Sequence, residues 1–437
     1  MIMVMIRPET EMKNSGVQWL GNIPKEWSVG KVKHEFYATK TIVGDKVNDY
    51  ERLALTLNGV IKRSKDAGDG LQPEKFDGYQ ILKEHELVFK LIDLANVSTS
   101  RVGLSPYTGL VSPAYIVLHH RKDMNPRYGE YYFLSMWMNE VFNHIGGDGV
   151  RSALNAKDLL NIPYLKVSPD EQQAIADYLD ETCSKIDEII AEAKASIDEY
   201  KELRQGVIFE AVTKGLDKNV EMKDSGVEWI GEIPVDWNIA KINRVAWTTS
   251  GATPLRSKET EYYDNAVIRW VRTLDLNNGH VTDSSEKITE TALKNSSCSI
   301  MPVKTVCVAM YGGSGTIGKS GILEVECATN QAICSIVSDK KVLNPDYLHY
   351  VIMAVRKYWM KYAVGTRKDP NINQQIIAQM RIPIPQLSKQ DIIVNHLDKV
   401  TDKCDSLISE KESLINDLEA YKKSLIYEVV TGKRRVV

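Results

Sequence analysis

Residues 12–27 read MKNSGVQWLGNIPKEW, and residues 222–237 read MKDSGVEWIGEIPVDW. Ten of the sixteen positions are identical, and four of the others are conservative replacements. So close a match at a separation of 210 residues indicates an internal repeat. We call each copy a Trp box. The chain is therefore predicted to be built twice, and we expect its target to have two similar halves as well.

A second match appears at a shift of 218 residues, where residues 171–215 align with residues 389–433. In both segments apolar or small residues recur at spacings that alternate between four and three, which is the heptad pattern of a coiled-coil seam. The stretch SPDE at 168–171 has the character of a helix start. Each segment is predicted to be a helix of roughly 40 residues, about 60 Å long. The predicted seam comprises Ile175, Leu179, Ile186, Ile189 and Leu203 in the first helix, and Ile393, Leu397, Val400, Leu407, Leu414, Leu418 and Leu425 in the second.

Two matched seams in one chain are most simply explained if they pack against each other as an intramolecular coiled coil. The alternative is that each helix lies on its own domain with a solvated outer face. We favour the coiled coil, because the alternative gives no reason for two seams with the same spacing.

Between box and helix lie two segments, 28–160 and 238–380, that differ in most residues but share landmarks. NPRY at 125–128 matches NPDY at 344–347, and an Ile-Pro pair precedes each long helix. Short β-rich runs such as AYIVLHH and TVCVAMY alternate with helical stretches, which is typical of an α+β domain. The order of elements is therefore box, α+β domain and long helix, followed by the same three again.

The composition is that of an ordinary globular protein, with 43% hydrophobic and 26% charged residues in a chain of 437. At this length more than one domain is expected. No apolar run approaches the roughly 18–20 residues of a membrane-spanning helix. The opening MIMVMIRPET lacks the features of a signal peptide. The six cysteines form no C-x-x-C pair, so we expect free thiols in the cytoplasm rather than a zinc site or disulfides.

The charge is distributed unevenly along the chain. A net charge of −3 and a pI near 6.3 argue mildly against a nucleic-acid partner. Residues 238–370, however, carry 17 Lys and Arg against 12 Asp and Glu, whereas residues 170–215 carry 5 against 12. The net charge therefore averages over one basic and one acidic segment. It does not show whether the partner is a nucleic acid or a protein, so that inference rests on the organisation of the chain.

Residues 313–320, GSGTIGKS, fit the P-loop expression G-x-x-x-x-G-K-[ST] without a mismatch. A P-loop requires a helix directly after the Lys, because the helix N-terminus holds the phosphates. Here the chain continues with GILEVE, which has the pattern of a strand. The favoured interpretation is a Gly-rich turn between strands.

The NPRY and NPDY stretches are similar to the N-P-P-Y with which methyltransferases hold a flipped adenine. A charged residue replaces the second Pro in each copy, and no Gly-rich cofactor-binding turn accompanies either. An Asn that caps a helix, followed by Pro at its first position, explains both stretches. The eight His residues show no metal-ligand spacing, and neither G-x-S-x-G nor H-E-x-x-H is present. The sequence therefore indicates no catalytic apparatus and no metal site in this chain.

Taken together, these features closely resemble the specificity subunit of type I restriction–modification systems. The resemblance is carried by the two Trp boxes, GLVSPAYIV in the first half, TSGATP, GTIGKSGI and ATNQAI in the second, and two heptad helices that begin near EQQ and KQD. It covers nearly the whole chain, with the exception of a short apolar extension before the first box. The extension has no clear role in the sequence pattern.

The resemblance implies an α+β fold with two tandem, pseudo-repeated target recognition domains, separated by two long helices that form an antiparallel intramolecular coiled coil. The predicted divisions are 1–27 for the N-terminal extension and first box, 28–160 for the first recognition domain, 161–215 for the first spacer helix, 216–237 for the linker and second box, 238–380 for the second recognition domain, and 381–437 for the second spacer helix.

The same resemblance implies a non-catalytic subunit that reads double-stranded DNA. Each recognition domain would read half of a bipartite site, and the helices would bind two methylation subunits, with motor-nuclease subunits joining later. Adenosylmethionine, ATP and magnesium are expected on those partners, and no cofactor is expected on this chain. Equivalent major-groove surfaces recur about 34–36 Å apart, so two heads held apart by a rod can read separate grooves. Because the two domains differ in sequence, we expect an asymmetric site.

Base-reading side chains are expected in loops and among the residue types that contact bases and phosphates. The candidates are Lys62, Arg63, Lys65, Arg101, Tyr107 and Arg151 in the first domain, and Arg256, Lys258, Tyr311, Ser314, Lys319, Arg367 and Lys368 in the second. A solvated charge is the alternative interpretation of each. For the whole chain the alternatives are a self-contained adenine methyltransferase or P-loop NTPase, and a coiled-coil scaffold without DNA readout.

Overall fold

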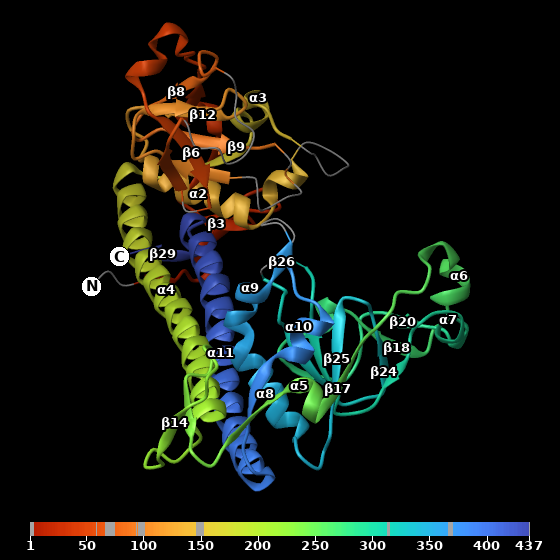
Figure 1. Ribbon diagram of the computed structural model, residues 1–437. Coiled ribbons are helices and arrows are strands. Elements are labelled where there is room, and N and C mark those ends of the chain that lie inside the picture. The colour runs from red at the N-terminus through yellow and green to blue at the C-terminus, as the bar shows by residue number, and fades with distance from the viewer. Residues whose placement is uncertain are drawn as a thin grey trace. The chain divides into compact units, whose positions relative to one another are not determined.

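The computed structural model describes residues 4–57, 59–65, 75–92, 94, 101–145, 153–312, 315–365 and 370–436 (Figure 1). The chain divides into two compact units. Unit 1 consists of residues 1–193 and 412–437, and unit 2 consists of residues 194–411. Each unit contains one Trp box, one α+β domain and part of both long helices. The two units therefore consist of the same three kinds of part, as the repeat in the sequence leads one to expect.

Both Trp boxes fold into the same antiparallel hairpin. In the first box β2 (Met12–Asn14) pairs with β3 (Asn22–Pro24), and in the second β14 (Met222–Asp224) pairs with β15 (Glu232–Pro234) in the same register. Gly21 and Gly231, at φ of +62° and +71°, begin the return of each hairpin in a conformation that favours glycine. The last Trp of each box, Trp27 and Trp237, is 2% exposed. The predicted repeat is confirmed in three dimensions.

The first α+β domain contains two four-stranded sheets. Its base is a pairing of β4 (Ser28–Lys31) with β13 (Pro163–Lys166), which brings the two ends of the domain together. One sheet has the order β10 (Arg101–Leu104), β9 (Leu87–Lys90), β12 (Ile116–His120), β5 (Phe36–Ala38). The other has the order β7 (Gly59–Arg63), β6 (Arg52–Thr56), β11 (Gly109–Val111), β8 (Gln80–Leu82). The helices are α1 (Val32–Glu35), α2 (Pro126–Met138) and α3 (Ala156–Leu160), with 3-10 turns at Gly44–Asp49 and Val141–His144.

The second α+β domain is closed by the equivalent pairing of β16 (Asn238–Lys241) with β28 (Arg381–Ile384). A five-stranded sheet has the order β17 (Ala246–Ser250), β25 (Ile333–Ser338), β22 (Val306–Ala309), β23 (Ser320–Leu323), β19 (Gly279–Val281). A four-stranded sheet has the order β20 (Lys287–Ile288), β18 (Ile268–Val271), β24 (Cys327–Thr329), β21 (Ile300–Met301). The helices are α5 (Ile242–Val245), α6 (Glu259–Tyr262), α7 (Glu290–Asn295), α8 (Pro345–Val355), α9 (Trp359–Tyr362) and α10 (Gln374–Gln379), and the short pair β26 (Val364–Gly365) and β27 (Pro370–Asn371) completes the domain.

The methyltransferase-like Asn-Pro stretches are helix starts, as predicted. The Asn125 side chain accepts hydrogen bonds from the first turn of α2, and Asn344 does the same for α8, with Pro at the first helical position in each. The side-chain amides also donate to Gln173 and Asp391 on the long helices. Since both ends of each Asn amide are used in this way, these residues join each α+β domain to a long helix.

The two long helices are α4 (Pro169–Lys214, 46 residues) and α11 (Leu387–Val430, 44 residues), as the heptads predict. In unit 1 the start of α4 and the end of α11 both contact the first Trp box. Trp27 donates its indole N–H to Glu171 at 2.8 Å, and the Tyr427 hydroxyl donates to the Trp19 carbonyl at 3.0 Å. Farther along, Lys422 pairs with Asp187 at 2.6 Å. The two helix segments therefore run antiparallel within unit 1.

The helices bury most of the predicted seam. Ile175, Leu179, Ile186, Ile393, Leu397 and Leu425 are buried, and Val400, Leu407 and Leu418 are partly buried. The prediction needs correction at Ile189, Leu203 and Leu414, which are exposed, while Ile190 and Ile415 are buried. A helix with 3.6 residues per turn drifts relative to a strict 3.5-residue repeat. Over a long helix the buried stripe therefore passes to a neighbouring residue.

Residues 4–11 of the apolar extension before the first box belong to unit 1. Its strand β1 (Val4–Ile6) pairs antiparallel with β29 (Arg434–Val436), which follows α11. Arg7, 7% exposed, donates to Glu26 of the box and to Glu171 of α4, both at 2.8 Å. The extension therefore ties the first box to both long helices, a role that the sequence pattern did not reveal.

Replacement of Arg7 by Ala is expected to lower the free energy of unfolding of unit 1 by about 1–3 kcal/mol, because two carboxylates lose a charge-assisted hydrogen bond. Thermal unfolding, with hydrogen exchange to localise the loss, measures this. Lys185→Ala is the matched control, since Lys185 forms an exposed ion pair with Glu181 on α4, and its removal is expected to change stability by less than about 1 kcal/mol. Equal effects of the two variants would contradict the assigned role of Arg7.

Among the described residues no helix is both long and apolar enough to span a membrane. All six cysteines are buried as free thiols.

Candidate nucleic-acid interface

The first recognition domain gathers several of its predicted basic residues on one hairpin. Lys62 and Arg63 end β7, Lys65 follows it, and all three line a hollow of about 490 Å³ beside residues 48–52. The hairpin forms because β6 and β7 pair antiparallel over five residue pairs. Lys65 donates to the Val47 carbonyl at 2.7 Å, which joins it to the 3-10 turn Gly44–Asp49.

Lys62 connects this hairpin to a second loop. Its ammonium pairs with Glu51 at 2.6 Å and lies 5.1 Å from the ring centre of Tyr107, so two of the predicted residues are in contact. The hydrogen bond to Glu51 raises the pKa of Lys62, which keeps its positive charge at neutral pH. A half-exposed ammonium beside an exposed aromatic ring can contact both a phosphate and a base.

Two further candidates of the first domain are placed only in part. The backbone of Arg101 begins β10, on the sheet opposite to the β6–β7 hairpin, and its side chain lies outside the described structure. Arg151 lies outside the described residues. The residues that the structure brings together are thus Lys62, Arg63, Lys65 and Tyr107.

In the second domain Arg256 and Lys258 lie on a 3-10 turn (Arg256–Lys258) that leads into α6. Arg256 forms a bidentate pair with Glu286 at 2.6 and 2.7 Å and lies 4.2 Å from the ring centre of Tyr263. The hydrogen bonds from Arg256 lower the pKa of Glu286. The guanidinium is therefore held in a fixed plane by a carboxylate, in the geometry with which Arg also binds phosphate.

Tyr311 and Lys319 flank the Gly-rich turn between β22 and β23. These strands pair antiparallel, so the turn is followed by a strand and not by the helix that a P-loop needs. Gly318 has a φ of +73°, and a Cβ atom there would lie 2.2 Å from the Trp359 ring. The P-loop-like glycine is therefore explained by packing, as the sequence indicated. Ser314, Arg367 and Lys368 lie outside the described residues.

The sequence reasoning missed further polar residues beside Arg256. Arg272 also binds Glu286, at 2.9 Å, and Arg269 pairs with Asp283 at 2.9 Å. Arg269 lies on β18 next to buried Trp270, and Arg272 follows the end of that strand. Arg256 and Arg272 therefore share Glu286, and Arg269 forms a separate pair with Asp283.

A second missed feature is a pair of exposed aromatic residues at equivalent positions. Tyr37 on β5 and Trp247 on β17 are 43% and 52% exposed, and the shift of 210 residues that relates the boxes also relates these two. Their partners in the neighbouring strands are His119 and Val337. The repeat in the sequence, extended beyond the box, would have identified them.

Comparison with known proteins agrees with this architecture. Residues 234–417 match the family model of the type I restriction modification DNA specificity domain. The MjaVIII specificity subunit of Methanocaldococcus jannaschii is 24% identical over 319 residues, which cover 70% of each chain. The putative MjaX specificity subunit of the same organism is 20% identical over 435 residues, which cover 95% of this chain and 96% of that one.

A solved structure described as the structural basis of complex assembly and conformational transition of the type I R-M system contains a chain of the same fold. The TM-score is 0.70 at 12% sequence identity, and the match covers 94% of this chain and 99% of that chain. At this identity the match concerns the fold alone. With two Trp-box repeats, two α+β domains and two long helices on the same chain, the protein is similar along nearly its whole length to the specificity subunits of type I restriction–modification systems, and residues 234–417 match their DNA specificity domain.

Proposed function

We propose that the chain reads an asymmetric, bipartite site on double-stranded DNA, with one half read by each recognition domain. The observation that carries this proposal is that two units of equivalent construction differ in the surfaces that hold their basic residues. The first presents the β6–β7 hairpin, and the second presents the turn before α6 together with β18. Because the two units are built alike but carry their basic residues on different surfaces, we expect them to read two different half-sites of one DNA target.

The chemistry of these surfaces suits DNA. In both domains a cationic group lies beside an aromatic ring, as Lys62 does beside Tyr107 and Arg256 beside Tyr263. In both it is held by a carboxylate that a phosphate can replace without loss of geometry. Arg and Lys also form the commonest specific contacts to guanine in the major groove. We propose that these residues, with the other predicted candidates, make the phosphate and base contacts.

The long helices serve as a spacer and as a binding surface for partners. A helix of 46 residues is about 69 Å long, about twice the 34–36 Å between equivalent major-groove surfaces. Residues 170–215 carry 12 acidic and 5 basic residues, and such a surface favours a protein partner over phosphate. We propose that each unit binds one methylation subunit, that motor-nuclease subunits join this complex in the cytoplasm, and that adenosylmethionine, ATP and magnesium are held by these partners.

Exchange of one recognition domain is expected to change one half of the DNA target and leave the other half and the gap unchanged. The exchanged segment should run from 28 to 166, because β4 and β13 pair at the base of the domain. The parent and the exchanged chain are each co-expressed with the methylation subunit, and methylated adenines are mapped across the host genome by single-molecule sequencing.

The reciprocal exchange of residues 238–384, which keeps β16 paired with β28, is the matched control and should alter only the other half-site. A change of both halves in either exchange would contradict independent reading. If the parent forms a complex with an active methylation subunit and yields no new methylation, the proposed DNA readout is wrong.

A further inference from the structure

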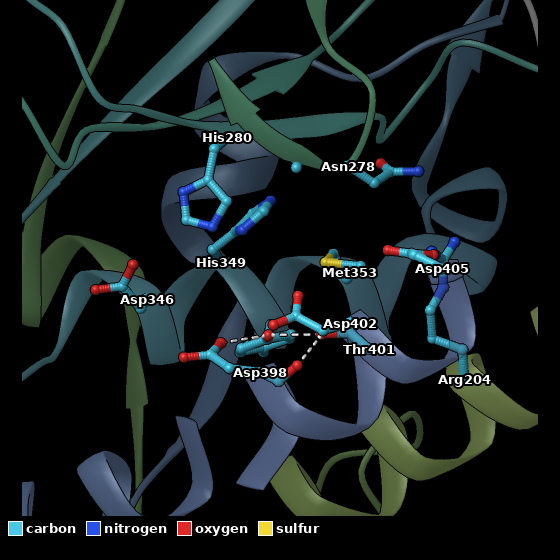
Figure 2. A pocket seen from close by; sticks show the side chains of 12 residues that line it. Arg204, Asn278, His280, Asp346, His349, Met353, Asp398, Thr401, Asp402 and Asp405 are labelled. Atoms are coloured by element: carbon cyan, nitrogen blue, oxygen red, sulfur yellow. Dashed lines mark hydrogen bonds and ion pairs between the residues drawn. The ribbon is translucent and has the colours of Figure 1, made fainter. Parts of the chain in front are cut away.

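Unit 2 contains a polar cavity of about 270 Å³ where β19, α8 and segments of both long helices meet (Figure 2). It is lined on one side by His280 and His349 and on the other by the aspartates of α11. No group of three or more His, Cys, Asp and Glu residues in the described chain is arranged to hold a metal ion. The cavity therefore has the polarity of a binding site without the geometry of a metal centre.

His349 is a buried polar group without a partner in this cavity. It is 6% exposed, and its Nε2 atom makes no hydrogen bond with the described residues. Figure 2 shows the imidazole pointing from α8 into the space between His280 and Asn278. Burial lowers the pKa of His349 to about 3, so the ring is neutral. Buried polar atoms of this kind are normally hydrogen-bonded, and a nitrogen of a neutral imidazole can donate or accept. The unpaired Nε2 atom therefore indicates that the surroundings of His349 suit a polar ligand.

The opposite wall carries carboxylates without a cation. Asp398 accepts a hydrogen bond from the Tyr350 hydroxyl at 2.6 Å, but neither Asp398 nor Asp402 forms an ion pair with any described residue. Asp405 is neutralised by Arg204, and Asp346 by Lys304 at 3.0 Å. The wall therefore retains two negative charges, which excludes a phosphate-bearing occupant and favours a cationic one.

Unit 1 shows which cation this arrangement takes. There Tyr131 donates to Asp180 at 2.8 Å, as Tyr350 does to Asp398. Lys422 pairs with Asp187, as Arg204 does with Asp405. In unit 1, however, Arg127 of α2 adds a guanidinium that donates to Asp180 and, at 2.6 Å, to Asp177.

The residue of unit 2 that corresponds to Arg127 is Asp346, since NPRY aligns with NPDY. The first unit thus supplies its own guanidinium. The second has lost it and carries Asn395 where the first carries Asp177, but it keeps the Tyr–Asp pair. The replacement of Arg by Asp leaves the cavity open and more acidic.

We propose that this cavity binds an arginine side chain of a partner protein, which supplies to Asp398 the guanidinium that Arg127 supplies to Asp180 in unit 1. A planar guanidinium can donate to Asp398 and Asp402 together, whereas an ammonium lacks this fixed fork. The presence of a protein partner at this place rests on the proposed function. The preference of the cavity for a guanidinium is independent of the proposed function.

The first test uses N-acetyl-arginine amide as the probe. The full chain, labelled with ¹⁵N in its histidines, is titrated with the probe and with N-acetyl-lysine amide. We expect a saturable shift of the His349 signals with the arginine compound, and binding weaker by about tenfold or more with the lysine compound. The double variant Asp398→Asn, Asp402→Asn should abolish the shift, and the exposed control Asp417→Asn should not. No shift in the parent, or the same shift in the double variant, would overturn the proposal.

The second test uses Asp346→Arg, which restores in unit 2 the residue that unit 1 carries. The new guanidinium is expected to occupy the cavity from within, so that the probe no longer binds. Lys304 keeps its pair with Glu324 at 2.8 Å, which limits the loss of stability, and circular dichroism checks the fold. Continued binding of the probe to this folded variant would contradict the assigned site.

Binding to the methylation subunit distinguishes this proposal from the proposed function. In a complex with the methylation subunit, the double Asn variant and Asp346→Arg are expected to bind that subunit about tenfold more weakly than the parent does. If both variants bind the methylation subunit as the parent does, and the parent methylates normally, the proposal that an arginine of the partner binds in this cavity is wrong. The proposed function is unaffected by that result. Failure of the parent itself to assemble would instead count against the proposed function.

Discussion

Replacement of Trp27 by Ala is expected to lower the free energy of unfolding of unit 1 by about 3–5 kcal/mol, the usual range for a buried Trp. Trp27 is 2% exposed, and its indole N–H donates to Glu171 at the start of α4. Its ring also packs near Gly432, just after α11. The truncation therefore leaves a cavity where the box meets both long helices, and it removes one of the hydrogen bonds to Glu171, which keeps its pair with Arg7.

Differential scanning calorimetry, with hydrogen exchange to assign the transition to unit 1, measures this loss. Trp247→Ala is the control, because Trp247 is 52% exposed and its removal is expected to change stability by less than about 1 kcal/mol. A loss of similar size in both variants would show that Trp27 is not the packing centre of the first box.

Replacement of Gly251 by Ala is expected to destabilise the second recognition domain by about 3 kcal/mol. A Cβ atom at Gly251 would lie 1.9 Å from the carbonyl oxygen of Thr329, which belongs to the backbone and has no side-chain freedom to move away. The same carbonyl accepts a hydrogen bond from Ala252 at 3.0 Å, so the new methyl group would separate the TSGATP segment from β24. This glycine lies after β17, at the crossing from the five-stranded to the four-stranded sheet.

Chemical denaturation of unit 2 gives the measurement. Gly315→Ala provides the comparison, since a Cβ atom there meets nothing within 4 Å and its φ is not in the left-handed region. We expect a change of less than about 1 kcal/mol at this position. If Gly251→Ala is tolerated as well as Gly315→Ala, the close approach of the two segments is absent in solution.

Features that depend on local chemistry were predictable from the sequence. Asn125 and Asn344 cap helices because a side-chain oxygen and a following Pro suit a helix start in any context. The turn between β22 and β23 was distinguished from a P-loop because the strand-like residues after Lys319 are adjacent to it in sequence. The long helices were visible because a heptad pattern is a property of consecutive residues.

The candidate interface was only partly predictable. Residue type and an expected place in loops singled out Lys62 and Arg256, although Lys62 lies on β7. The sequence did not show that each is paired with a carboxylate, Glu51 or Glu286. The partner of Arg256 lies 30 residues away and is brought to it by the pairing of β18 with β20, to which Glu286 is adjacent. Such pairs depend on the register of strands, which a single sequence does not specify.

By itself the sequence determined that the chain is built twice, with two boxes, two different α+β domains and two heptad helices, because repetition and periodicity are read from consecutive residues. Only the tertiary structure decided that each unit combines parts of both long helices and that Arg7 joins the first box to them. It alone placed Asp398 and the buried His349 in one cavity, where no described guanidinium pairs with Asp398. These features join residues up to more than 400 positions apart, and their energies arise from burial and charge pairing that exist only after the chain has folded.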